Sequence, residues 1–165
     1  MSYSQVTSLP GLEKLKGLNS LTLDLSRSGI TKLAGLEQLK SLTSLNLNLT
    51  SSDVTHLAEL KQLTRLTSLN LDLSFSQVTS LEGLEQLKGL TSLTLDLRGS
   101  QVTSFAGLEQ IKELTSIEMT LPASLLSNFS RSNIRPDITR LWIVADVNTP
   151  LVVPSGCRFV GVKDY

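Results

Sequence analysis

The sequence of 165 residues is poor in cysteine and in aromatic side chains. Cys157 is its single cysteine, and Phe, Trp and Tyr together make up 4% of the residues. A lone cysteine excludes a disulfide within the chain and favours a reducing compartment, so we expect a cytoplasmic protein. With so few aromatic rings, a hydrophobic core has to be built by repetition of aliphatic side chains.

Charge of one sign and long apolar runs are also lacking. Fifteen basic residues balance fifteen acidic ones, whereas a protein that binds a phosphate backbone carries an excess of Lys and Arg. Thr, Asn, Asp or Arg interrupts each apolar stretch, and no basic segment followed by an apolar one stands at the N-terminus. We therefore expect no nucleic-acid partner, no membrane span and no signal peptide.

Groups that would support catalysis are equally scarce. His56 is the only histidine, and it shares a repeat position with Ser8, Lys32, Ser80 and Ser104, which predicts an exposed turn residue. Cys157 lies several coils farther along, so we expect it to be roughly 15–20 Å from His56, too far for a thiolate–imidazole pair. No metal-ligand cluster or phosphate-binding loop is apparent. The sequence predicts a protein that is not an enzyme and has no cofactor.

What the sequence does contain is a repeat of 24 residues. One tetrapeptide recurs in phase at Ser4–Thr7, Ser28–Thr31, Ser52–Thr55, Ser76–Thr79 and Ser100–Thr103. A leucine column at Leu21, Leu45, Leu69 and Leu93 continues to Ile117, and one further step reaches Leu141 within Ile138–Ile143. The period predicts five units and a sixth strand in register with them.

Within one unit the apolar spacing changes from three residues to two. Leu33, Leu36, Leu39 and Leu42 suit a helix or 3₁₀ turn, whereas Leu45, Leu47 and Leu49 suit a strand. Eight buried apolar side chains per unit contribute about 12–24 kcal/mol. Ordering 24 residues costs about 1–2 kcal/mol each. A single unit therefore does not fold alone, and the units must stack into a solenoid.

The repeat resembles the leucine-rich repeats, whose pattern is L-x-x-L-x-L-x-x-N-x-L. Removal of Asp24-Leu25 from Leu18–Leu33 gives that pattern, with Ser28 at the Asn position, and the same holds in the next three units. The inserted pair preserves the alternation of faces, so we expect a longer strand rather than a bulge. In place of the family's asparagine ladder we expect a hydroxyl ladder at Ser28, Ser52, Ser76 and Ser100. The turn sequence is most similar to bacterial, internalin-like repeats.

This resemblance implies an α/β leucine-rich-repeat solenoid, with a curved parallel sheet on the concave face and helical or 3₁₀ segments on the convex face. We assign residues 1–123 to five repeats, with units starting at 4, 28, 52, 76 and 100, and residues 124–165 to a diverged sixth repeat and a small C-terminal cap. In that cap, 149–153 and 158–162 are expected to be short strands. The chain opens partway through a repeat, so we expect a piece of a larger protein whose uncapped first coil frays or self-associates end to end.

The family implies that partners bind the concave face. Residues that alternate with the strand leucines point to that face. Our candidate partner-binding residues are therefore Thr22, Asp24, Asn46, Asn48, Asn70, Asp72, Thr94, Asp96, Glu118, Thr120, Arg140 and Trp142. Trp142 either seals the last coil or serves as a binding anchor. Carboxylates about 5 Å apart repel by less than about 1 kcal/mol in water, so this column does not require a bound cation.

The expected function is protein–protein interaction or ligand recognition, with a protein or peptide partner that is basic in character. One hypothesis is the sensing part of a larger bacterial protein, such as an intracellular sensor of the NACHT type. The alternatives are a secreted or surface adhesion module similar to internalins, and a designed or purely structural scaffold. Pairs such as Glu37/Lys40 and Glu85/Lys88 are expected to form a solvated convex face.

Overall fold

The chain forms a coil that repeats a strand, a corner, a 3₁₀ helix and a return segment. The computed structural model describes residues 6–122, 125 and 140–144. Its strands are β1 (Ser20–Asp24), β2 (Ser44–Asn48), β3 (Ser68–Asp72), β4 (Ser92–Asp96), β5 (Ser116–Thr120) and β6 (Arg140–Val144). The 3₁₀ helices are η1 (Leu12–Lys14), η2 (Leu36–Gln38), η3 (Ala58–Gln62), η4 (Leu84–Gln86) and η5 (Leu108–Gln110).

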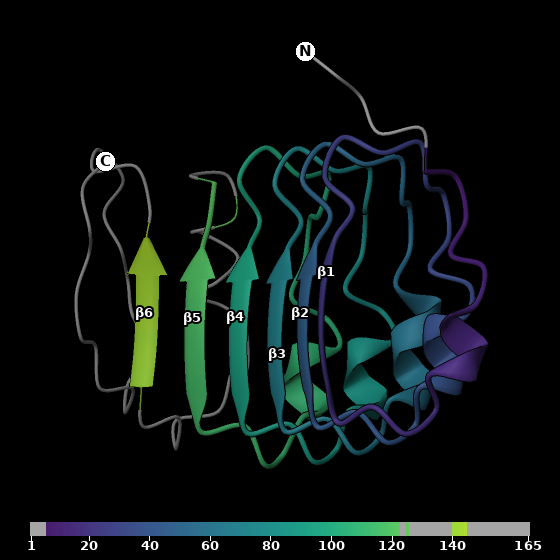
Figure 1. Cartoon of the computed structure of the whole chain (residues 1–165). Helices are drawn as coiled ribbons and strands as arrows, with labels where there is room; N and C mark the ends of the chain where they lie inside the picture. The colour runs from purple at the N-terminus through teal and green to yellow at the C-terminus, as the bar shows by residue number, and fades with distance from the viewer. Residues whose placement is uncertain (1–5, 123–124, 126–139, 145–165) are drawn as a thin grey trace.

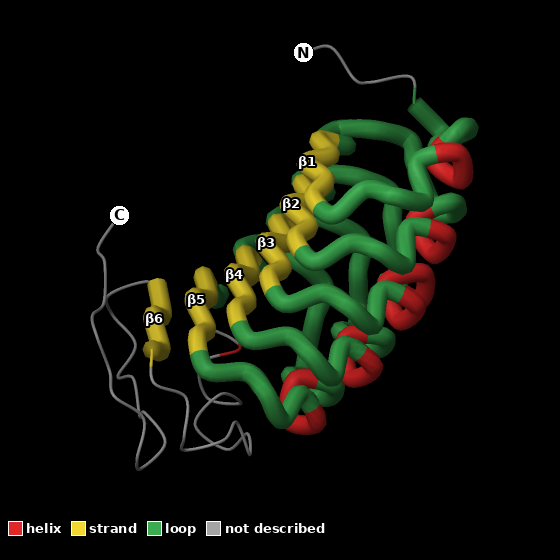
Figure 2. Tube along the Cα trace, turned by 60° about the horizontal axis from the view of Figure 1, so that its bottom comes forward, coloured by secondary structure: helices red, strands yellow, loops and turns green. Residues whose placement is uncertain are grey.

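All six strands belong to one parallel sheet in the order β1-β2-β3-β4-β5-β6 (Figure 1). Each residue pairs with the one 24 positions later, as in Leu21 with Leu45 and Leu93 with Ile117. The sixth strand predicted from the period is confirmed, because Leu141 pairs with Ile117. The stack is an arc with the strands on its inner side and the 3₁₀ helices on its outer side (Figure 2).

The predicted wider strand face is also confirmed. The backbone ladder continues past each five-residue strand, since Leu25 N–H donates to Asn48 O at 2.8 Å and Leu49 N–H donates to Asp72 O at 2.8 Å. The alternation of faces is preserved through the inserted pair, because Leu25 and Leu49 are both buried. The two extra residues therefore lengthen the paired segment without a bulge.

The core lies between the sheet and the 3₁₀ helices and consists mainly of leucine. The apolar side chains predicted to point inward in the second unit, from Ile30 to Leu49, are at most 1% exposed. Their equivalents in the first coil, such as Leu21 and Leu23, are only partly buried. A neighbouring coil on each side therefore decides burial in this stack.

Glycine turns the chain into the 3₁₀ helix in four of the coils. Gly11, Gly35, Gly83 and Gly107 have φ between 91° and 105°, a region that L side chains rarely adopt. A Cβ on Gly83 would lie 2.9 Å from the carbonyl oxygen of Leu57. Where the third coil has Glu59 instead of glycine, the helix starts earlier and runs over five residues. Spacing alone did not predict this change.

Two hydroxyl ladders flank the strands. At the strand entrance, Thr43 Oγ1 donates to Asn19 O at 3.0 Å, and the threonines at 67, 91 and 115 repeat this bond to the preceding coil. The predicted serine ladder is only half formed. Ser28 Oγ donates to Leu25 O at 2.6 Å and Ser76 Oγ accepts from Val78 N–H at 3.4 Å. Ser52 Oγ and Ser100 Oγ are buried without a hydrogen-bond partner.

Several predictions fall outside the described residues. These are the C-terminal cap with its two short strands at 149–153 and 158–162, the environment of Cys157, and the two alternatives for the Trp142 side chain. In the part of the chain that is described, no helix is long and apolar enough to cross a membrane.

Candidate partner-binding surface

The predicted partner-binding residues lie in columns along the inner face of the sheet. Backbone pairing aligns Thr22, Asn46, Asn70, Thr94 and Glu118 in one column. It aligns Asp24, Asn48, Asp72, Asp96 and Thr120 in a second column, at the carboxyl ends of the strands. Arg140 and Trp142 continue the backbone register of Ser116 and Glu118. The structure thus brings the candidates together on one sheet.

The strand-end column has a structural role that the sequence reasoning missed. The backbone N–H groups of Ser26, Thr50, Ser74 and Arg98 each donate to the Asp or Asn two residues earlier, at 2.9–3.0 Å. These Asx turns end the strands and start the corners. The hydrogen bonds from Ser26 hold the pKa of Asp24 below its ordinary value.

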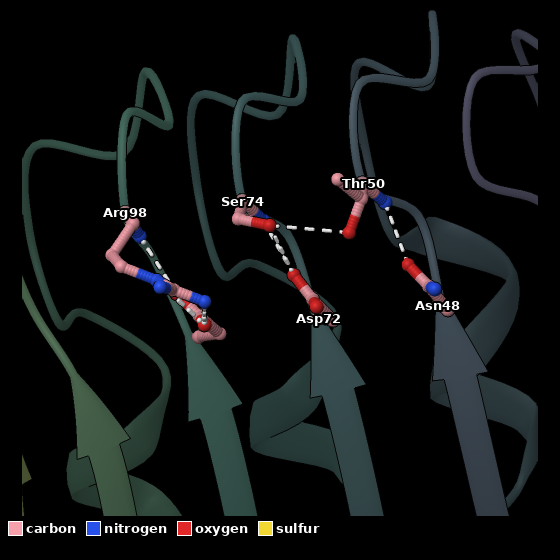
Figure 3. A network of polar contacts seen from close by, with 6 residues as sticks. Asn48, Thr50, Asp72, Ser74 and Arg98 are labelled. Carbon is pink, nitrogen blue, oxygen red and sulfur yellow. Dashed lines mark hydrogen bonds and ion pairs between the residues drawn. The ribbon is translucent and has the colours of Figure 1, made fainter.

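Side chains add further polar contacts in three neighbouring coils, and one of these contacts joins two of the coils (Figure 3). Ser74 Oγ donates to Asp72 Oδ1 at 2.6 Å, and the hydroxyls of Thr50 and Ser74 are 3.1 Å apart. The guanidinium of Arg98 binds both carboxylate oxygens of Asp96, at distances of 2.6–3.0 Å. The strand ends are therefore ordered before any partner arrives.

The middle column is different, since no hydrogen bond joins its side chains to one another in the described chain. Thr22, Asn46, Asn70 and Glu118 are exposed and Thr94 is half-buried. Hydroxyl, amide and carboxylate groups here remain available to a partner, with neighbouring strands about 4.8 Å apart. These residues offer hydrogen-bonding groups that the fold does not use.

The fold is shared with known structures. A crystal structure of internalin C2 from Listeria monocytogenes superposes with a TM-score of 0.58 at 20% identity, over 97% of this chain and 77% of that one. The chain has the leucine-rich-repeat fold. Its parallel sheet with 3₁₀ helices on the outer side confirms the predicted solenoid.

Two further leucine-rich-repeat structures of Listeria monocytogenes are less similar. Internalin F matches at 22% identity and a TM-score of 0.48, and the functional domain of internalin J at 18% and 0.36. The chain covers less than half of each, 46% and 38%. No family model matches the chain, and no curated protein matches it.

On the convex side of the leucine-rich repeats, glutamates stabilise the glycine corners. Gly35 N–H donates to Glu37 Oε2 at 2.7 Å and Gly83 N–H donates to Glu85 Oε2 at 2.6 Å. Burial acts to raise the pKa of each glutamate, but hydrogen bonds from its own N–H and from the glycine outweigh it and lower the pKa. Lys88 lowers the pKa of Glu85 further. The predicted Glu/Lys pairs are thus secondary to this role.

The convex side also has hollows between coils, which the sequence analysis did not predict. One of about 480 Å³ is lined by residues that include His56, Lys61, Glu82 and Glu85. The side chain of His56 is 49% exposed, and its Nδ1 lies 3.8 Å from Glu59 Oε2. This confirms that His56 is exposed. Among the described residues, no three His, Cys, Asp or Glu side chains are placed to hold a metal ion.

Proposed function

We propose that this leucine-rich-repeat chain is a recognition module that binds a protein or peptide on the inner face of its sheet. The observation that carries the proposal is the exposed polar column of Thr22, Asn46, Asn70 and Glu118. Its hydrogen-bonding groups are not used by the fold, and they stand beside strand ends that are already ordered. Short side chains on a rigid sheet lose little entropy when a partner binds.

The charge of the inner face favours a basic partner. Among the side chains that the structure describes on this face, the four carboxylates of Asp24, Asp72, Asp96 and Glu118 are opposed by the guanidinium of Arg98. The potential over this face is therefore negative, and it should attract Lys and Arg side chains. Such attraction weakens as the salt concentration rises from about 0.1 to 0.5 M, because screening shortens its range.

The test is a nuclear magnetic resonance titration of the chain with hexa-arginine and, separately, with hexa-glutamate. We expect hexa-arginine to shift the signals of Asn46, Asn70 and Thr94, and expect no such shifts with hexa-glutamate. Shifts confined to η2 and η4, or the absence of any shift, would overturn the proposal.

Charge-removing variants locate the effect without disturbing the Asx turns. Asp72→Asn with Asp96→Asn keeps an amide oxygen as acceptor, as Asn48 shows in the second coil. This pair should weaken hexa-arginine binding. Glu109→Gln with Glu113→Gln removes the same charge from exposed positions off the sheet and should have little effect. Equal weakening by both pairs would indicate attraction by net charge alone.

Self-association through the first coil is a second part of the proposal. The partly buried Leu9, Leu12, Leu18, Leu21 and Leu23 and the exposed Leu15 leave apolar surface at this end of the stack. Exposed apolar surface of this kind favours association. Sedimentation should show a mass that increases with concentration, and Leu15→Glu should reduce this increase. A monomer at all concentrations would exclude it.

The biological setting completes the proposal. The lone cysteine supports a cytoplasmic role, for example as the sensing part of a larger bacterial protein of the NACHT type. A secreted or surface adhesion module is the alternative. The gene sequence upstream discriminates between them, since an ATPase domain there supports the sensor and a secretion signal supports adhesion.

A further inference from the structure

Past each of the strands β1 to β4 the chain turns its corner through a residue in the left-handed conformation. These residues are Arg27, Ser51, Phe75 and Gly99, with φ of 53°, 54°, 55° and 60°. The conformation lets Phe75 N–H donate to Arg98 O at 2.7 Å, so the ladder continues while the chain turns. Glycine adopts it without strain, whereas a bulky side chain does so at a cost in free energy. Phenylalanine is thus an unfavourable residue for this corner.

Phe75 is also exposed to solvent, although it does not lie at an end of the stack. It is 60% exposed, more than any other large apolar side chain in the described part of the chain. The other two exposed ones, Val6 and Leu15, belong to the first coil, which has a neighbouring coil on only one side among the described residues. Phe75 lies in the third coil, between two complete ones. Its exposure adds a second cost to that of its backbone.

The next coil makes room for the ring. A Cβ added at Gly99 would lie 2.5 Å from Cδ1 and 2.6 Å from Cε1 of Phe75. The ring therefore rests on the backbone of Gly99, and a side chain at that position would displace it. This contact holds the aromatic ring in place while much of its surface stays open to solvent.

A carboxylate stands next to this ring along the chain. The backbone N–H and the hydroxyl of Ser74 both donate to Oδ1 of Asp72. Ser74 therefore donates no hydrogen bond to Oδ2. Only two residues lie between Asp72 and Phe75, so the two Cα atoms are at most about 10 Å apart. The neighbouring carboxylate of Asp96 is bound by Arg98. Asp72 is therefore the strand-end carboxylate closest in sequence to the ring. Unlike Asp96, it has no bidentate arginine partner among the described residues.

We infer that Phe75 and Asp72 form an arginine-recognition point at the rim of the sheet. Arginine is the side chain that fits both groups, because its planar guanidinium stacks on an aromatic face and donates hydrogen bonds to a carboxylate at once. Lysine offers a point charge without the stacking plane. The inference rests on the proposed function, since it specifies which residue type of a basic partner is recognised and where.

The experiment compares binding of hexa-arginine and hexa-lysine, which carry equal charge, by calorimetry at constant salt. The wild-type chain should prefer hexa-arginine. Phe75→Ser, which copies the corner residue Ser51, should weaken hexa-arginine binding by about tenfold, as a stacking contribution of about 1.4 kcal/mol implies. It should leave hexa-lysine binding nearly unchanged. Phe75→Leu keeps apolar bulk without an aromatic face and should lose the preference as well.

Stability provides an independent readout. Because the left-handed corner and the exposed ring are both unfavourable, Phe75→Ser should leave the thermal midpoint unchanged or raise it by a few degrees. Loss of the preference for arginine without loss of stability supports the inference. A Phe75→Ser chain that retains the preference, or a wild-type chain without one, overturns it. If Asp72→Asn with Asp96→Asn weakens both peptides but Phe75→Ser weakens neither, the proposed function stands and this inference fails.

Discussion

Truncation of one leucine column should measure how far neighbouring coils determine stability. Leu45 is 1% exposed and lies between Leu21 and Leu69 in the same column. Leu45→Ala removes a fully enclosed side chain and should destabilise the chain by about 2–5 kcal/mol. Leu21 is only partly buried and has a paired strand on one side only. Water can fill the space left by Leu21→Ala, so its loss should be about 1–2 kcal/mol.

The assay is urea unfolding monitored by circular dichroism, with the slope of each transition compared as well as its midpoint. Lys40→Ala, at an exposed position of the second coil, serves as the surface control and should change stability by less than about 0.5 kcal/mol. Equal losses for Leu45→Ala and Leu21→Ala would refute the dependence on neighbours. A loss for Lys40→Ala as large as that for Leu45→Ala would refute the assignment of inward and outward positions.

Two further predictions follow from the corners. The pKa values of Asp24, Glu37 and Glu85 are lowered in the folded chain. These carboxylates therefore stabilise the fold at pH values above the ordinary pKa, 3.8 for Asp and 4.5 for Glu. The stabilisation is lost as the pH falls through the folded pKa. Acid unfolding of Glu37→Gln, which keeps an acceptor for Gly35, should therefore depend less steeply on pH; an unchanged profile would contradict the assigned hydrogen bonds. Gly83→Ala, with φ of 105° and a Cβ only 2.9 Å from Leu57 O, should lose about 1–3 kcal/mol in urea unfolding. Gly17→Ala, where no atom lies within 4 Å of the added Cβ, should be nearly neutral or slightly stabilising, and equal losses for the two would exclude strain as the cause.

The strands and their register could be predicted from the sequence because leucine spacing alone determines them. The change from spacing three to spacing two predicted where each strand begins, and the period placed Leu141 opposite Ile117 despite the divergence of the sequence around it. Identical spacing leaves a single register in which every leucine is buried. The leucine period therefore locates a strand even where individual residues of the repeat pattern are replaced.

The hydrogen-bond partners of the polar side chains could not be predicted from the sequence, because spacing gives the face on which a residue lies and not its partner. Asp72 and Asn48 were both predicted to meet a partner, yet each also accepts the N–H two residues later. Asp or Asn recurs in this column, with Ser or Thr two residues later in three of the coils, and this pattern was a signal for Asx turns in the sequence. The corner at Phe75 was harder to foresee, because phenylalanine is not a residue that predicts a left-handed conformation.

The pairing of every strand residue with the one 24 positions later also bears on how such an array changes in evolution. Excision of residues 52–75 would join Ser51 to Ser76, and each remaining coil would meet a neighbour equivalent to the one it lost. Duplication of the same twenty-four codons would extend the inner face by about 4.8 Å. Unequal recombination between repeated coding segments would therefore change the length of the inner face by whole coils, while each hydrogen-bonded corner is inherited intact.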